Sequence, residues 1–184
     1  MKKSIALIAI LACLVTPLLA RTGYSILLSG AYNYNLTTDI ENGSSQAIGV
    51  QFSAKNGMKL YMQTEMGAFN LQDGDTHRSG NEVVNGVGLR IPLGKQSGLG
   101  LNALIGATQL TTRNAANNAA DTIQTAPLAD LGFYLERKVS DLTISLDAGV
   151  RLTNLSRRIN SDAAFNNIKN KHAVKIAARV AYGF

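Results

Sequence analysis

Eight charged residues stand where their side chains could form ion pairs inside a protein. Each lies on the polar side of a segment in which every second residue is apolar. The set holds four acids and four bases, namely Glu65, Asp130, Glu136 and Asp147 against Arg90, Arg151, Lys175 and Arg179. Enclosed charges are stable only when they are paired, so this balance favours an interior ion-pair network over a solvated face. A path for protons or ions is the alternative use of the same groups.

A second basic group lies near the end of the chain, between residues 154 and 171. Its bases are Arg157, Arg158, Lys169 and Lys171. Asp162 is the acid among them, and His172 follows directly. Facing outward, such a loop could bind the phosphates of lipopolysaccharide or an acidic host polymer by charge pairing. A solvated loop that keeps the chain soluble during export is the alternative.

The sequence gives little evidence for a metal site. Asp73 and Asp75 lie in a glycine-containing stretch, as calcium ligands do, but no acidic ligand follows at the required distance. The single cysteine can form neither an intrachain disulfide nor a thiolate cluster. We therefore expect no metal and no other cofactor.

The elements that must position these residues are strands. After residue 20 the apolar residues recur with a period of two, and no sustained helical pattern occurs. The alternating segments are 24–36, 47–54, 60–68, 86–93, 99–107, 129–136, 142–153 and 174–184. Short connections at 55–57, 94–98 and 138–141 alternate with longer polar ones at 37–46, 70–82, 112–126 and 154–171. Short turns at one rim and long loops at the other are typical of a meandering outer-membrane barrel.

The first short connection tests this pattern. If both flanking strands show their apolar residues on one face, the loop between them must hold an odd number of residues. A three-residue loop with Gly57 in the left-handed conformation meets this condition. It predicts that Ala54 pairs with Met58 and Phe52 with Leu60.

The apolar face of these segments could cover a soluble core or face lipid. It carries no charged residue, as lipid requires, because a Lys or Arg at the bilayer midplane costs about 2–4 kcal/mol. The opposite face holds many glycines, which suit the narrow lumen of a small barrel. They are Gly49, Gly67, Gly86, Gly88, Gly100, Gly106, Gly132, Gly149 and Gly183. We expect a membrane barrel, with a soluble barrel as the rival fold.

The first twenty residues are typical of a secretory signal. A basic start at Lys2 and Lys3 precedes an almost wholly apolar stretch, and Ala20 offers a small residue for cleavage. We therefore divide the chain into a cleaved signal peptide, 1–20, and a barrel domain, 21–184. A lipoprotein cut before Cys13 and a retained membrane anchor are the alternatives.

The composition agrees with this division. Removing Lys2 and Lys3 lowers the formal net charge from +6 to +4, which is too little to argue for nucleic acid. The mean hydropathy is near zero, which excludes a membrane protein of several helices and a disordered chain.

The last predicted strand is similar to a strand found in a known class of proteins. Its apolar face consists of Ile176, Ala178, Val180, Tyr182 and Phe184. This resembles the carboxy-terminal strand by which the assembly machinery recognises outer-membrane barrels. With the signal peptide and the eight segments, the chain resembles the small barrels of the OmpA membrane domain, OmpX and opacity-protein type. By pattern the resemblance covers nearly all of 21–184, although the aromatic girdle is thin and contains no Trp.

The resemblance implies an all-β, eight-stranded antiparallel up-and-down transmembrane β-barrel in the outer membrane, with both termini in the periplasm. We expect a monomer with a structural or surface-interaction role. Its four long loops would contact lipopolysaccharide, host ligands or the medium. The implied partners are outer-membrane lipid and the barrel-assembly machinery.

Two other functions stay open. His77 and Ser79 have the His-x-Ser spacing of the outer-membrane lipid A deacylases, in which the pair acts as base and nucleophile on a lipid-facing strand. Here they lie in the polar stretch 70–82, where the period of two is lost, so we expect solvated loop residues and no enzyme. The third hypothesis is a narrow passive pore, although an eight-stranded barrel is only just wide enough for its own side chains.

Overall fold

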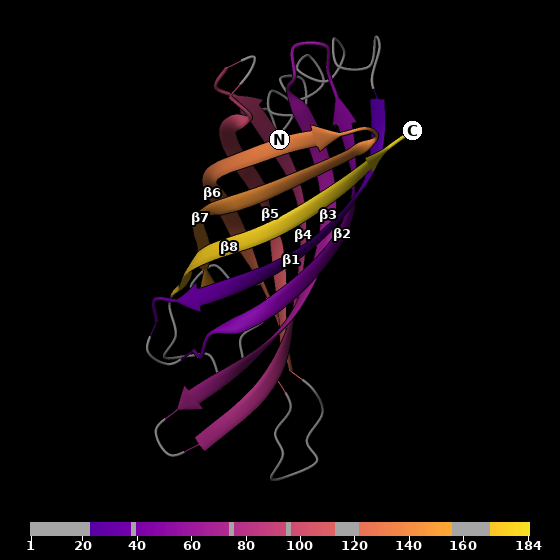
Figure 1. The fold of residues 1–184 in the computed structure, drawn as a ribbon. Helices are drawn as coiled ribbons and strands as arrows, with labels where there is room; N and C mark the ends of the chain where they lie inside the picture. The colour runs from indigo at the N-terminus through magenta and orange to yellow at the C-terminus, as the bar shows by residue number, and fades with distance from the viewer. Residues whose placement is uncertain (1–22, 38–39, 74–75, 95–96, 113–121, 156–169) are drawn as a thin grey trace, which may run out of the picture.

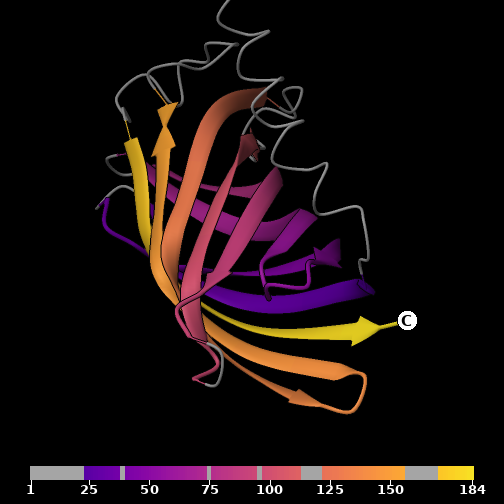
Figure 2. The ribbon, with the colours of Figure 1, turned by 90° about the horizontal axis from the view of Figure 1, so that it is seen from above.

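The fold is a closed antiparallel barrel of eight strands (Figure 1). The structure is a computed structural model that describes residues 23–37, 40–73, 76–94, 97–112, 122–155 and 170–184. The strands are β1 (Gly23–Asn35), β2 (Gly43–Ser53), β3 (Lys59–Asp73), β4 (Thr76–Pro92), β5 (Leu99–Thr112), β6 (Thr122–Val139), β7 (Leu142–Asn154) and β8 (Asn170–Gly183). Each strand pairs with its neighbours in chain order, and β1 pairs with β8 to close the barrel. In Figure 2 the yellow β8 accordingly lies between the indigo β1 and the orange β7.

The two faces of every strand differ in the way that the alternation predicts. Large apolar side chains point outward and are exposed; Ile105 and Leu146, for example, are each 61% exposed. Polar and charged side chains point inward and are buried, among them Gln51 and Arg151. A soluble barrel would show the reverse arrangement. The expected fold, a transmembrane β-barrel, is therefore confirmed, and no helix within the described ranges is long and apolar enough to cross a membrane.

The turn between β2 and β3 forms as its residues predict. Gly57 has a φ of 85°, which is in the left-handed region. The amide of Ala54 donates to the carbonyl of Met58 at 2.8 Å, and Phe52 pairs with Leu60. The glycine thus sets the register of the first hairpin and, with it, the inward face of β3.

The polar stretch 70–82 is not a long loop, contrary to the sequence prediction. β3 continues to Asp73 and β4 begins at Thr76, and these two residues are backbone partners. β2 pairs with β3 only as far as Gly67, and β5 pairs with β4 only as far as Gly80. The outer part of β3 and β4 is therefore a two-stranded ribbon that extends past its neighbours (Figure 1). Phe69 at the base of this ribbon packs in a buried apolar cluster, but beyond it polar residues stand on both faces, so the alternation ends before the strands do.

Candidate functional site: the charged lumen

The centre of the lumen is occupied by a cluster of two bases and two acids. Arg151 of β7 donates from Nη1 and Nη2 to both oxygens of Glu65 on β3, each at 2.9 Å. It also donates from Nε and Nη2 to both oxygens of Asp130 on β6, each at 2.8 Å. Lys175 of β8 contacts the same two carboxylates, with Asp130 at 3.3 Å. Such bidentate contacts are the strongest that a guanidinium makes, and they offset the loss of hydration on burial.

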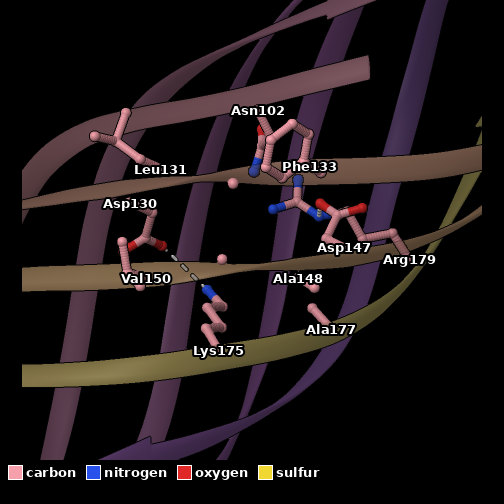
Figure 3. Close-up of a pocket in the computed structure, with 12 residues that line it drawn as sticks. Asn102, Asp130, Leu131, Phe133, Asp147, Ala148, Val150, Lys175, Ala177 and Arg179 are labelled. Atoms are coloured by element: carbon pink, nitrogen blue, oxygen red, sulfur yellow. Dashed lines mark hydrogen bonds and ion pairs between the residues drawn. The ribbon is translucent and has the colours of Figure 1, made fainter. Parts of the chain in front are cut away.

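A second cluster lies nearer the short-turn rim. Arg90 of β4 and Arg179 of β8 bind the two oxygens of Asp147 on β7, at 2.9 and 2.8 Å. Arg90 also lies 3.6 Å from Glu136 of β6, which pairs in addition with Lys59 of β3. Figure 3 shows Asp147 beside Arg179, and Asp130 joined to Lys175 of the central cluster. The two clusters therefore bring together all eight charged residues that the sequence places on the inward face.

Two tyrosines cover the guanidinium groups. Arg90 lies over the ring of Tyr134 at 3.8 Å, and Arg179 lies over the ring of Tyr61 at 4.8 Å. The hydroxyl of Tyr61 donates to Oδ1 of Asn102 at 2.9 Å. These rings shield the charges from water on their flat faces, where a guanidinium forms no hydrogen bonds.

The inward glycines make room for the tyrosines. A Cβ atom at Gly88 would lie 2.1 Å from the ring of Tyr61, and one at Gly100 would lie 2.3 Å from the ring of Tyr134. Both distances are shorter than any tolerable contact. At these positions the glycine-rich face thus reflects large aromatic neighbours as well as a narrow lumen.

The long-loop end of the lumen is closed differently. Lys171 of β8 pairs with Glu82 of β4, which also accepts a hydrogen bond from Thr108 at 2.9 Å. Beside this pair lies a buried apolar cluster of Ile40, Phe69, Leu110, Ala126 and Leu155. Lys171 is only 3% exposed, so its predicted place in the outward basic loop is wrong. β8 begins at Asn170, and the alternation of that strand turns Lys171 inward together with Lys175.

Sequence reasoning missed Lys59 and Glu82. Lys59 has the same parity as Glu65 on β3, and Glu82 has the same parity as Arg90 on β4. Extending the predicted strand 60–68 by one residue would have revealed Lys59, whereas the period of two is already lost at Glu82. With them included, charged and apolar side chains close the lumen between its centre and the long-loop end, and the cavity between the two clusters measures only about 20 Å³. That volume is enough for a single water molecule. At the short-turn mouth the lumen stays open as a pocket of about 580 Å³, lined by Gln51, Lys59, Tyr134 and Glu136 among others.

Comparison with solved structures places this barrel among known folds. Ail, the attachment invasion locus protein of Yersinia pestis, was solved with the heparin analogue sucrose octasulfate; it matches with a TM-score of 0.59 at 11% identity, over 89% of this chain and 99% of that chain. Neisserial surface protein A matches with a TM-score of 0.53 at 13% identity, over 88% and 97%. The N-terminal β-barrel domain of Pseudomonas aeruginosa OprF matches with a TM-score of 0.51 at 11% identity, over 89% and 100%. No family model and no curated protein matches the sequence.

The chain has the fold of the small outer-membrane β-barrel proteins. At these identities the likeness shows the fold alone. The remaining predicted residues lie outside the described ranges, on or directly after β8, and on β4. Arg157, Arg158 and Lys169 lie outside the described residues, and so do the predicted signal peptide 1–20 and Asp75.

Four of the five predicted assembly residues lie on the outward face of β8, and Phe184 directly follows that strand. Tyr182 is 48% exposed and Phe184 is 77% exposed, and their rings meet edge to face at 5.2 Å. Tyr24 and Phe52 form a similar pair at 5.4 Å, also near the short-turn rim. These four rings form the aromatic girdle expected at this membrane interface.

His77 and Ser79 lie on β4 and not in a loop, which corrects their predicted placement. Ser79 is exposed. Within the described part of the chain, no group of three or more His, Cys, Asp or Glu is placed to hold a metal ion.

Proposed function

We propose that this outer-membrane barrel acts as a structural anchor that presents a ligand-contacting surface at its long-loop end. The observation that carries the proposal is the filled lumen. Buried ion pairs and an apolar cluster close the interior at its centre and at the long-loop end, so the pocket at the short-turn mouth does not continue as a path for solutes. The outer wall faces lipid, so the surface left for recognition is the long-loop end, with the β3–β4 ribbon and the loops 36–42, 113–121 and 155–169.

The ligand that this surface would bind is an anionic saccharide. Arg157, Arg158 and Lys169 give the last loop a strong positive charge in sequence. Guanidinium and ammonium groups bind phosphate and sulfate through charge-assisted hydrogen bonds. The Ail structure contains a sulfated sugar, which supports this ligand class for a barrel of the same fold. Lipopolysaccharide phosphates and a sulfated host polymer share this chemistry.

The test is retention on immobilised heparin and on immobilised lipopolysaccharide. A variant with Arg157→Gln, Arg158→Gln and Lys169→Gln should elute from both at markedly lower salt than the parent barrel, because each lost cation removes one ion pair. Lys55→Gln, in the exposed turn at the opposite rim, is the matched control and should elute like the parent. Equal elution of the triple variant and the parent would end the proposal.

We also propose that residues 1–20 are cleaved during export and that the outward face of β8 guides assembly of a monomer into the outer membrane. Removal of Phe184 should then reduce the heat-modifiable form recovered from outer membranes, whereas Tyr32→Phe, at the other end of the barrel, should not. Unchanged recovery after removal of Phe184 would contradict the role of the last strand.

A lipid-modifying hydrolase is the second candidate, because His77 and Ser79 have the His-x-Ser spacing and both lie within β4. In this mechanism His77 acts as the base and Ser79 as the nucleophile. Ser79→Ala should abolish deacylation of labelled lipopolysaccharide. Absence of deacylation by the native protein would remove this candidate.

A further inference from the structure

A polar pair interrupts the apolar outer wall of the barrel. Thr64 of β3 and Asn85 of β4 both point outward and are backbone partners. Oγ1 of Thr64 donates to Oδ1 of Asn85 at 2.8 Å. On the same face, Met62 and Met66 flank Thr64 along the strand and are 51% and 62% exposed.

The hydrogen bond between Thr64 and Asn85 leaves the side-chain amide donors of Asn85 unused. Since Oδ1 of Asn85 accepts from Thr64, the Nδ2 group of Asn85 keeps its two N–H donors. Among the residues that the structure describes, neither donor has a protein acceptor. An amide donor left unpaired in hydrocarbon is unfavourable, so this position favours a lipid group that can accept a hydrogen bond.

The pair lies in a hollow of the outer wall with a volume of about 610 Å³. Its apolar lining comes from β1 to β5 and consists of Ile26, Ile48, Val50, Met62, Val87 and Ile105. The hollow reaches the backbone at Gly49, Gly86 and Gly106. Gly86 and Gly106 are partners across β4 and β5, and a Cβ at Gly106 would lie 2.1 Å from the carbonyl oxygen of Asn85.

The hollow lies just below the outer polar boundary of the wall. One step nearer the long-loop end, the outward positions include Gln46 of β2, paired with Met66, and Gln109 of β5, paired with Val83. Both glutamines are exposed. Two residues along a strand span about 6.6 Å, so Asn85 lies within about 7 Å of this boundary, measured along the strand. At that depth lipid chains carry their carbonyl and hydroxyl oxygens.

We propose that this hollow binds an acyl chain of lipopolysaccharide, with Nδ2 of Asn85 donating to a carbonyl or hydroxyl oxygen near the head of the chain. The aliphatic lining covers the chain below that oxygen. Lipopolysaccharide fits because Thr64 and Asn85 lie at the side of the hollow nearer the long loops, and hence toward the outer leaflet, and because its chains bear hydroxyl as well as carbonyl oxygens. The inference rests on the outer-membrane location proposed above but uses no residue of the basic loop.

Native mass spectrometry of the detergent-purified barrel with deep-rough lipopolysaccharide tests this site. The parent barrel should retain one copy, and Asn85→Leu should weaken its binding about three- to tenfold, as expected for the loss of one hydrogen bond. Gln109→Leu is the matched control, because it removes an outward polar group that does not line the hollow. Phosphatidylethanolamine, whose chains bear carbonyl but no hydroxyl oxygens, should bind more weakly than lipopolysaccharide.

Equal binding by Asn85→Leu and the parent overturns the proposal, and so does an equal loss in Gln109→Leu. Preference for phosphatidylethanolamine overturns the choice of lipid. Should Asn85→Leu not fold, the side-chain amide signal of Asn85 in NMR spectra of the parent decides: a shift on adding lipopolysaccharide supports the site, and no shift refutes it. The variant with Arg157→Gln, Arg158→Gln and Lys169→Gln retains the hollow. Its weaker heparin binding therefore tests the proposed function, whereas weaker lipopolysaccharide binding by Asn85→Leu tests the acyl-chain site.

Discussion

The centre of the lumen and its long-loop end both bury charge, but they stabilise it in different ways. At the centre, Arg151 makes four hydrogen bonds to two carboxylates from two other strands. At the long-loop end, Lys171 and Glu82 form one pair, supported by Thr108 and closed off by apolar side chains. The comparison teaches that the importance of a buried charge depends on how many groups its removal leaves unpaired.

The largest effect is expected at Arg151. Arg151→Met leaves Glu65 and Asp130 with Lys175 as their shared base, so we expect the free energy of unfolding to fall by about 3–5 kcal/mol. Urea titration of the barrel in phospholipid vesicles, followed by circular dichroism and gel mobility, measures this loss.

Arg137→Met is the control for that variant, because Arg137 is exposed on the outside of β6. We expect its stability to change by less than about 0.5 kcal/mol. Equal stabilities for the two variants would show that the central cluster does not hold the barrel together.

A smaller effect is expected at the long-loop end. Lys171→Met leaves Glu82 unpaired but still hydrogen-bonded to Thr108, so the loss should be about 1–3 kcal/mol by the same titration. A loss larger than that of Arg151→Met would reverse the comparison between the two ends.

The smallest effect concerns Tyr61. Tyr61→Phe keeps the ring over Arg179 and removes the hydrogen bond to Asn102, for an expected loss of about 0.5–1.5 kcal/mol. Tyr32→Phe, on the exposed outer face, is the matched control. If both substitutions have the same effect, the hydroxyl of Tyr61 contributes nothing to the lumen.

The sequence could predict the inward face wherever alternation persists. Glu65, Asp130 and Asp147 each lie among regularly spaced apolar residues, so the alternation alone assigns their side chains to the inward face. Glu82 and Lys171 lie where polar residues fill both faces. Alternation therefore does not show on which face of the strand their side chains lie. The strands continue through Glu82 and Lys171 because their backbones pair with neighbouring strands. A local sequence pattern does not show such pairing.

The outer hollow lay beyond prediction for a different reason. Thr64 and Asn85 stand on separate strands, and their hydrogen bond depends on the register of the β3–β4 hairpin. That register is set by a connection that the sequence indicated as a long loop. The glycines that line the hollow were recognised as small residues, but the sequence could not show which atoms approach them.

The central claim is that this membrane barrel is sealed by its own side chains, so that its interactions take place on its outer surfaces. Planar-bilayer recording of the purified barrel tests this claim most directly. We predict a stable baseline without discrete conductance steps. Reproducible steps from the folded, heat-modifiable protein would contradict the claim.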